Sequence, residues 1–560
     1  MYLRGLFTAV ILTCASGAAL AQDTAAVQSA LSILGYDAGP ADGVWGGKTR
    51  TALQAFYADT GGQFSGRLGR DDHTALLGAL RQRIEAEVEA DSEKASPIYP
   101  SLDFSPGIEV WFPSQYAFAD GASRPARRDF PFAVIQPYVH DFDGDSCDDI
   151  LVQFMDSHAH PYLIRGGPEA GEGDFVAELA EYIPKSRSIR NAALRDIDGN
   201  GSADFVGFTA PHGLEGRGYV PRPDPEIVIP QGGDAWATTH STYSHGGLVG
   251  DVNGDGIVDI FPIEEDGTKP RHAILGDGKG GFSERFRVTA LSGDFIFDAQ
   301  SADLNGDGVD DFVAITSLDY SRAGAVPPSR AGENGTLAIA LGEPGKSINE
   351  LEFVRLGTHA MDDLHWTAYR LQAAYGEAGD VGYSGSGVYS APSNVDLIDF
   401  DGDGDLDILV GYFVSTNSSW KTSGFRMFRN DNGQFSDVTD EVAPHQPATL
   451  FHGDQQPGEI SNQATDAMLG ASMIDMNADG QKDLLLSIQT PDVMHHDDYR
   501  ATVYVSTNGR LLPAAASDDD FRYTAHMVAG DFNCDGKDDV AGAGFNNESE
   551  HSIRIMLGVN

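Results

Sequence analysis

The stretch DFDGDSCDDILVQF (141–154) joins a short acidic loop to an apolar run, and the same pattern recurs along the chain. Seven copies of a nine-residue loop have Asp at positions 1 and 9 and Asp or Asn at positions 3 and 5. Position 6 is Gly except for Ser146, as suits a sharp turn that needs a positive φ. Loops 1 to 7 are DFDGDSCDD (141–149), DIDGNGSAD (196–204), DVNGDGIVD (251–259), DLNGDGVDD (303–311), DFDGDGDLD (399–407), DMNADGQKD (475–483) and DFNCDGKDD (531–539).

Alternating short oxygen side chains on a tight turn converge on one point, which suits a hard cation such as calcium. We therefore expect up to seven Ca²⁺ ions, held by positions 1, 3, 5 and 9. Loops 1 and 5 have carboxylates at all four positions and should hold the ion most firmly. A solvated acidic surface, the alternative, does not explain the fixed positions. The predicted ligands are Asp141, Asp143, Asp145, Asp149, Asp196, Asp198, Asn200, Asp204, Asp251, Asn253, Asp255, Asp259, Asp303, Asn305, Asp307, Asp311, Asp399, Asp401, Asp403, Asp407, Asp475, Asn477, Asp479, Asp483, Asp531, Asn533, Asp535 and Asp539.

The residues around the loops distinguish between calcium folds. An EF-hand needs a bidentate Glu at position 12 and flanking helices. Position 12 is never acidic here, and strand-like runs such as DILVGYF (407–413) follow the loops instead. Further on, turns such as GDGKGGF (276–282) lie between apolar segments, as in a hairpin. The repeating unit is therefore strand, loop, strand, turn, strand, turn, strand.

The spacing of the loops predicts the architecture. Successive loops start 55, 55, 52, 96, 76 and 56 residues apart, and a period in this range with four strands per unit is typical of propeller blades. The residues resemble the FG-GAP/VCBS repeats of integrin-α-like propellers over 107–560, and that resemblance implies calcium in the loops. We predict a mainly β chain with a seven-bladed β-propeller. A strand near Ile108–Phe112 is expected to complete the last blade and remove its open edge.

Composition limits the partners of the chain. The 37 Lys and Arg residues against 84 Asp and Glu give a net charge of −47, which argues against nucleic acid or an anionic membrane as the partner.

Residues 1–21 combine Arg4, the apolar run LFTAVIL (6–12) and a small-residue end, as in a secretory signal peptide cleaved after Ala21. No later stretch has the length of a membrane span. We expect export to the periplasm or cell envelope.

A second module precedes the loops. In residues 22–90 apolar side chains recur at helical spacing, and LGYDAGPADGVWGGKT (34–49) connects the first two predicted helices. The segment resembles the small three-helix peptidoglycan-binding domain. That resemblance implies that Tyr36, Asp42 and Trp45 offer an aromatic and polar surface to wall fragments. The alternative is that Gly43, Gly46 and Trp45 only shape the loop and fill a small core. Tyr57 replaces the usual Gln. Residues 91–106 are Pro- and Ser-rich towards their end and are expected to form a linker.

Catalytic motifs are scarce. Asp156, His158 and His160 have a spacing that could ligate zinc, but they fall in a predicted turn without a further ligand nearby, so surface histidines are the favoured interpretation. The chain has no GxSxG, HExxH or P-loop motif. The many carboxylates belong to the loops and do not nominate a glycosidase pair. The sequence predicts no recognisable enzyme.

Two long intervals could carry further function, because long loops on rigid scaffolds often do. Residues 320–395 include an aromatic segment (361–390), and residues 411–470 include a second excess (445–463). Aromatic residues with Gly and Ser suit sugar stacking or a protein partner, but equally a small satellite core. The leading hypothesis is a cell-wall-associated binding or scaffold protein for a glycan or a protein. A lyase-like polysaccharide enzyme and a purely structural envelope protein remain as alternatives.

Two cysteines remain after the expected signal cleavage. Cys147 is at position 7 of loop 1 and Cys534 at position 4 of loop 7. The first and last blades are neighbours in a closed ring, so an oxidising compartment would permit a bridge if the Cα atoms come within about 7 Å. The alternative is two separate small side chains, each in its own turn.

Overall fold

In this computed structural model, two parts of the chain are described, an N-terminal helical domain and the blades of a β-propeller. The described residues are 24–93, 107–112, 135–154, 160–168, 175–184, 189–209, 224–231, 236–242, 246–263, 270–292, 295–317, 336–357, 388–416, 419–443, 467–477, 479–489, 502–513, 524–545 and 551–558. The predicted signal peptide, Asp156, His158, segment 445–463 and segment 361–390 up to residue 387 lie outside them.

The helical domain contains three helices, over residues 24–33, α2 (Gly47–Thr60) and α3 (Arg70–Glu93). Helix α2 buries Thr49, Ala52, Leu53 and Phe56, one face at helical spacing. It ends at Gly61, whose φ of 78° is the left-handed conformation common at a helix C-terminus. Ten buried residues from all three helices and the first connection form a core of their own. Helix α3 continues three residues past the expected end of the domain at residue 90.

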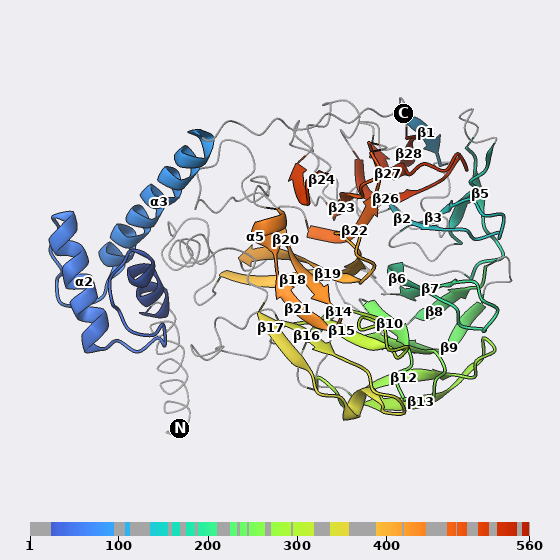
Figure 1. Ribbon diagram of the computed structural model, residues 1–560, viewed down its shortest axis with the longest axis horizontal. Helices are drawn as coiled ribbons and strands as arrows, with labels where there is room; N and C mark the ends of the chain where they lie inside the picture. Colours follow the sequence, from blue (N-terminus) through green and yellow to red (C-terminus); the bar gives the residue numbers. More distant parts are fainter. Residues whose placement is uncertain are drawn as a thin grey trace, which may run out of the picture.

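The rest of the described chain forms seven four-stranded antiparallel sheets arranged as a ring (Figure 1). We number them as blades 1 to 7. Blades 1 to 3 contain β2 (Ile135–His140), β3 (Asp149–Phe154), β4 (Tyr162–Ile164) and β5 (Ala177–Leu179); β6 (Ile189–Arg195), β7 (Asp204–Thr209), β8 (Asp224–Ile229) and β9 (Trp236–Thr242); and β10 (Gly246–Gly250), β11 (Asp259–Ile263), β12 (Arg271–Gly276) and β13 (Phe282–Val288).

Blades 4 to 6 repeat this order, and two short helical turns, η3 (Ile348–Glu350) and α5 (Thr439–Val442), lie between their elements. Their strands are β14 (Phe295–Ala302), β15 (Asp311–Ser317), β16 (Thr336–Ala340) and β17 (Val354–Gly357); β18 (Val388–Ile398), β19 (Asp407–Thr416), β20 (Ser419–Asp431) and β21 (Gln434–Asp437); and β22 (Ala467–Ile474), β23 (Asp483–Gln489), β24 (Thr502–Thr507) and β25 (Arg510–Pro513).

Blade 7 combines the two ends of the propeller sequence. Its strands follow the order β26 (Thr524–Gly530), β27 (Asp539–Phe545), β28 (His551–Met556) and β1 (Ile108–Trp111). Strand β1 pairs with β28 in an antiparallel register that sets Ile108 opposite Ile555. The prediction that a strand near residues 108–112 completes the last blade is therefore confirmed.

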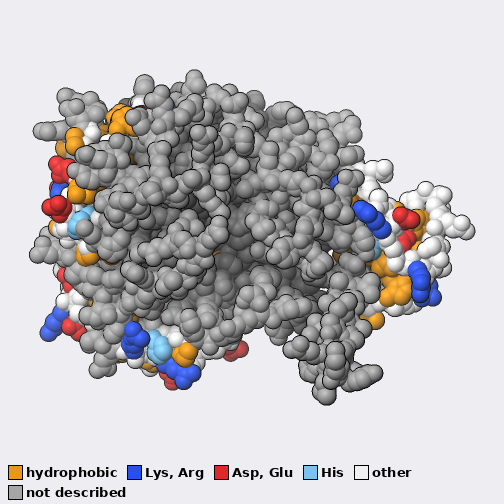
Figure 2. Space-filling view, turned by 180° about the vertical axis from the view of Figure 1, so that it is seen from behind, with side chains coloured by type: hydrophobic (Ala, Val, Ile, Leu, Met, Phe, Trp, Pro, Cys, Tyr) orange, Lys and Arg blue, Asp and Glu red, His pale blue; other side chains and the backbone are white. Residues whose placement is uncertain are grey.

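The core lies between the blades rather than within one layer. Successive residues of a strand face opposite sides of its sheet, so Ile150 and Val152 pack against blade 7 while Leu151 packs against blade 2. Seven apolar clusters of this kind fill the seven junctions between neighbouring blades. Because both faces of each sheet are covered, the strands have continuous apolar runs. Described side chains at the surface carry charges of both signs (Figure 2).

The innermost strands carry polar side chains at irregularities in their pairing. Strands β6 and β14 are irregular next to Asn191 and Asp298. Asp298 accepts hydrogen bonds from Asn191 Nδ2 in blade 2 (2.6 Å) and from the backbone N–H of Val395 in blade 5 (3.1 Å). Burial raises its pKa to about 7. Burial, and then the charge of Asp298, raise the pKa of Asp396. Blades that are not adjacent in the ring are thus linked through a carboxyl group.

Candidate metal centres

Every predicted metal loop connects the first strand of a blade to its second. Loop 1, for example, begins after β2 ends at His140, and its position 9, Asp149, is the first residue of β3. The 28 predicted ligands therefore lie in seven equivalent places around the ring. The local fold follows from the spacing, because each loop needs two sharp reversals. In loop 1 these are at Gly144 (φ 81°) and Ser146 (φ 76°).

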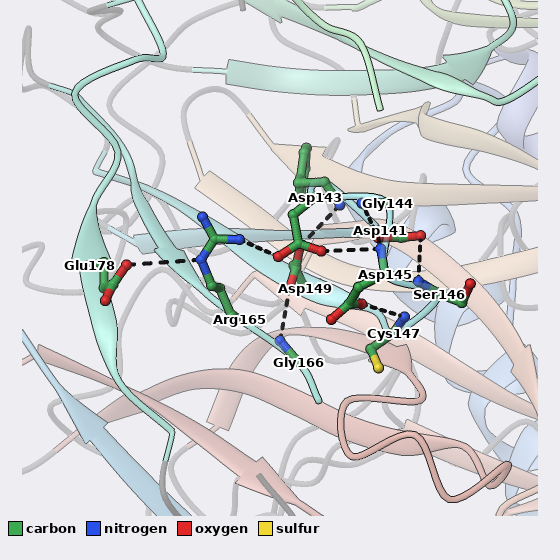
Figure 3. Close-up of polar contacts among 11 residues, drawn as sticks. Asp141, Asp143, Gly144, Asp145, Ser146, Cys147, Asp149, Arg165, Gly166 and Glu178 are labelled. Carbon is green, nitrogen blue, oxygen red and sulfur yellow. Dashed lines mark hydrogen bonds and ion pairs between the residues drawn. The ribbon is translucent and has the colours of Figure 1, made fainter. Parts of the chain in front are cut away.

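Backbone amides organise each loop around its first carboxylate. In loop 1, Asp141 Oδ1 accepts the N–H groups of Gly144 (2.8 Å) and Asp145 (3.1 Å), and Oδ2 accepts that of Ser146 (3.0 Å; Figure 3). Such side-chain to backbone bonds are why Asp and Asn favour tight turns. The turn conformation tolerates departures from the consensus, because Ser146 and Cys534 (φ 57°) adopt it without being glycine. Ala478 lies outside the described residues.

The position 9 carboxylates tie the loops to the rest of their blades. All seven are buried, at no more than 1% exposed. In each, Oδ2 accepts the backbone N–H of position 2 at 2.8–3.2 Å. Oδ1 accepts a backbone N–H within two residues of the end of the third strand, at 2.6–3.4 Å. Sequence reasoning assigned these residues only to metal binding and missed this structural role.

Burial of these carboxyl groups raises their pKa. Asp259, Asp407 and Asp539 reach about 7, and Asp149, Asp311 and Asp483 about 6. The accepted backbone N–H groups counter the effect only in part. An opposite charge close by favours the ionised form of a carboxyl group, and a bound cation is the strongest such charge. The buried carboxyl groups therefore fit a site that a cation completes.

Three loops bring three carboxylates together in space. One oxygen from each of positions 1, 3 and 9 lies within 4.8 Å of the others in loops 1, 2 and 5: Asp141, Asp143 and Asp149; Asp196, Asp198 and Asp204; Asp399, Asp401 and Asp407. Calcium binds oxygen at 2.3–2.6 Å, so oxygens at this spacing can share one ion. Position 5 is outside these groups. In loop 1 it accepts the N–H of Cys147 (2.8 Å).

The remaining four loops have Asn instead of Asp at position 3. An amide oxygen is also a ligand for hard cations. In loops 3 and 4 the amide of this Asn donates to the position 5 carboxylate, Asn253 to Asp255 (2.9 Å) and Asn305 to Asp307 (3.1 Å). The seven loops thus share a backbone design but differ in how much charge they concentrate.

Position 8 links neighbouring blades where it is Asp. Asp148, Asp310 and Asp538 each accept the backbone N–H of position 1 in the preceding loop, at 2.8–2.9 Å. The sequence marks these residues, because only three loops have an acidic residue at position 8. However, the sequence of one loop does not indicate a partner in another blade. These bonds connect one metal loop to the next.

The ring closes with a covalent bond. Cys147 and Cys534 form a disulfide with Cα atoms 5.4 Å apart, across 387 residues of sequence. The hypothesis of a bridge across the closure is confirmed. Backbone bonds accompany it, from Asp148 N to Asp531 O (3.2 Å) and from Gly167 N to Phe532 O (3.0 Å). Loops 1 and 7 are therefore fixed to each other.

In the helical domain, a buried glutamine organises the predicted ligand loop. Gln28, 2% exposed, donates to Asp42 Oδ1 (3.0 Å) and accepts the N–H of Gly43 (2.9 Å). Asp42 is exposed, and Trp45 is half-buried beside Phe64 with ring centroids 6.0 Å apart. Tyr36 donates its hydroxyl to Asp59 (3.0 Å). Gln28 was not singled out from the sequence, although it lies one turn from the core position Leu31.

The Gln-to-Tyr departure at residue 57 is accommodated within the fold. The Tyr57 hydroxyl donates to buried Asp72 (2.9 Å), and its ring stacks on Phe64 at 6.4 Å.

Of the histidine pair considered for zinc, only His160 is described, and its Nδ1 lies 2.6 Å from the carbonyl of Ile183. Among the described residues, no helix is both long and apolar enough to cross a membrane.

Comparison with known proteins supports both modules. The family model of the peptidoglycan binding domain matches residues 21–76, and that of the FG-GAP-like repeat matches residues 251–314, which include loops 3 and 4. The chain thus has a peptidoglycan-binding domain at its N-terminus and an FG-GAP-like repeat within a seven-bladed β-propeller. Its Asp groups have the spacing to hold metal ions.

Other likenesses of this propeller protein are more distant. The Vibrio cholerae biofilm matrix protein Bap1 is 12% identical, with a TM-score of 0.28, and the alignment covers 82% of this chain and 92% of Bap1. A Photorhabdus luminescens Tc holotoxin pore is 15% identical, with a TM-score of 0.30, over 80% of this chain and 16% of the pore chain. The propeller assignment therefore rests on strand order. A 3-dehydroquinate synthase of Staphylococcus aureus is 30% identical over 95 residues, 17% of this chain, and the chain spans about a quarter (26%) of the synthase.

Proposed function

We propose that this protein is an exported, calcium-stabilised binding protein of the cell envelope. Residues 22–90 attach it to peptidoglycan, residues 91–106 form the linker, and the propeller of residues 107–560 presents a surface to a glycan or protein ligand. The observation that carries the proposal is the combination of a separately folded peptidoglycan-binding domain, with its own buried core, and a rigid ring of seven equivalent loops.

Calcium is the ion that the loops fit best. Positions 1, 3, 5 and 9 offer only carboxylate and amide oxygens, which are the ligands of a hard cation, and no described loop adds a His or a free thiol. The ion would neutralise carboxylates that otherwise lie within 4.8 Å of one another in loops 1, 2 and 5. The chain's part is to fix these side chains through the backbone bonds of positions 1 and 9.

In the helical domain, we propose that Tyr36, Asp42 and Trp45 contact the wall. Both aromatic rings are half-buried, so each retains an accessible face, and Gln28 holds the connecting loop in place. Aromatic faces suit the apolar sides of sugar rings, and Asp42 offers an acceptor for hydroxyl or amide groups.

Sedimentation with purified peptidoglycan tests this division of labour. Residues 22–93 should sediment, and residues 97–560 should not. In the mature full-length chain, Trp45→Ala should weaken sedimentation about tenfold, whereas Val44→Ala, which removes a 64% exposed neighbour, should not change it. Equal sedimentation of both fragments would show that the propeller itself binds the wall and would contradict the proposal.

A further inference from the structure

Two arginines of the propeller lie against predicted metal ligands. Arg165 Nη1 pairs with Asp143 Oδ2 in loop 1 (Figure 3), and Arg429 Nε lies 3.0 Å from Asp401 Oδ2 in loop 5. Asp143 and Asp401 are both position 3 ligands, and each belongs to a group of three convergent carboxylates. Among the described residues, a guanidinium pairs with a position 3 carboxylate in these two loops.

The two arginines occupy the same place in their blades. Each immediately precedes the residue whose backbone N–H donates to the position 9 carboxylate, Gly166 in blade 1 and Asn430 in blade 5. In the other five blades that place holds an apolar residue: Pro230, Leu275, Leu341, Val505 and Leu557. The register of the third strand therefore sets this side chain beside position 3.

The two arginines lie beside the two loops that have the most carboxylates at the predicted ligand positions. Loops 1 and 5 are the two with Asp at all of positions 1, 3, 5 and 9. In loops 3 and 4 the Asn at position 3 instead donates its amide to the position 5 carboxylate. Two Asp residues at positions 3 and 5 have no such donor between them, and the guanidinium supplies one from outside the loop.

We propose that Arg165 and Arg429 are tethered counter-cations that stabilise loops 1 and 5 without metal and thereby lower their affinity for Ca²⁺. This inference rests on the calcium binding proposed above. A guanidinium on a carboxylate oxygen forms a charge-assisted hydrogen bond that an incoming cation must weaken, and two cations at one carboxylate repel each other. The sequence alone ranks the calcium affinity of the two four-carboxylate loops as the highest, and the arginines lower that affinity.

The surroundings of each arginine shape the size of the effect. Arg165 is 45% exposed and also lies 3.9 Å from Glu178, whereas Arg429 is 29% exposed and lies over the ring of Phe400 at 5.7 Å. Solvent screens the more exposed pair more strongly. We therefore expect a larger change in calcium affinity at loop 5 than at loop 1.

The test compares Arg165→Gln and Arg429→Gln in the full mature chain, with Arg426→Gln as a matched control. Arg426 lies on the same strand as Arg429 and pairs with Asp437 (2.8 Å), outside the metal loops. Melting temperatures are measured in EDTA and in saturating Ca²⁺, and calcium binding by calorimetric titration of the stripped protein. The two loop variants should melt lower in EDTA and bind Ca²⁺ about three- to tenfold more tightly, so the gap between the two melting temperatures widens.

A double-mutant cycle separates counter-ion action from packing. With Asp143→Asn or Asp401→Asn already present, removing the arginine should no longer widen the gap. A gap that is unchanged or narrower in both single arginine variants, relative to Arg426→Gln, would overturn the inference while leaving calcium binding intact. A wild-type protein that binds no Ca²⁺ would overturn both this inference and the proposed function.

Discussion

The propeller and the helical domain are stabilised in different ways. The helical domain gathers ten buried residues into one core, and a buried amide, Gln28, fixes its ligand loop. The propeller spreads its core over seven junctions and concentrates negative charge in the loops beside them. The first should fold independently of ions, whereas the second should depend on a cation at the carboxylates of its loops. The comparison predicts that conditions acting on metal, charge or ring closure affect only the propeller.

Among substitutions, opening the ring should have the largest effect. Replacing both Cys147 and Cys534 by Ser releases a loop of 387 residues in the unfolded chain and should cost the propeller about 4 kcal/mol. Calorimetry of the mature chain should show the propeller transition at lower temperature and the helical transition unchanged. Equal transition temperatures for variant and wild type would mean that the non-covalent contacts between blades 1 and 7 suffice.

Removing a position 9 carboxylate should come next. Asp259→Ala leaves the backbone N–H groups of Val252 and Gly276 without their acceptor and should lower the free energy of unfolding by about 3 kcal/mol, measured in EDTA to exclude a metal contribution. The matched control is Asp255→Ala, at exposed position 5 of the same loop. Similar losses in both variants would contradict the structural role assigned to position 9.

The links between loops should contribute less. Asp538→Ala removes the acceptor for the N–H of Asp475 and should cost about 1–2 kcal/mol in EDTA, against a smaller loss for Asp535→Ala in the same loop. Denaturant unfolding of both variants checks this. If Asp535→Ala is the more destabilising, position 8 does not connect the blades in the way described.

The smallest effect concerns pH. Burial raises the folded pKa of Asp298 to about 7, above an unfolded value of about 3.9. The stability from its neutral form is complete below the unfolded pKa and is lost as the pH rises through about 7. In saturating Ca²⁺ the propeller should lose about 1 kcal/mol between about pH 6 and pH 8, and Asp298→Asn should flatten that slope. A slope as steep in the variant as in the wild type would assign the titration elsewhere, Asp396 first.

Much of the architecture was predictable because it repeats. Seven loops with fixed positions identified the blades and pointed to the closing strand, and the LGY to Trp45 segment identified the helical domain. The metal ligands stay a prediction. The bonds between blades were not predictable, because a loop's own sequence does not specify its partner in the next blade. Asp at position 8, as in Asp148 and Asp310, set three loops apart from the others but did not indicate the partner. A recurring Leu-Gly at or just after the end of the third strand, as at Leu275 and Gly276, was a usable signal: a Cβ on Gly276 would lie 2.1 Å from the Val258 carbonyl oxygen.

The arginines illustrate a second limit. Arg165 and Arg429 lie 22 and 28 residues from their Asp partners, so only the register of the third strand brings them to position 3. Once that register is known, comparison of the seven equivalent places separates the two arginines from five apolar residues. Sequence alone therefore predicts the ligands of a site, and the fold adds the side chains that we propose compete with the metal.

Calorimetry of the mature chain in EDTA and in Ca²⁺ tests the central claim most directly, namely that calcium in the seven loops stabilises the propeller. Binding to the folded state alone raises its stability by mass action. We predict that EDTA lowers the propeller transition by more than about 10 °C, that excess Ca²⁺ restores it better than Mg²⁺, and that the helical transition stays in place. A propeller transition at the same temperature in EDTA and in Ca²⁺ would contradict the account.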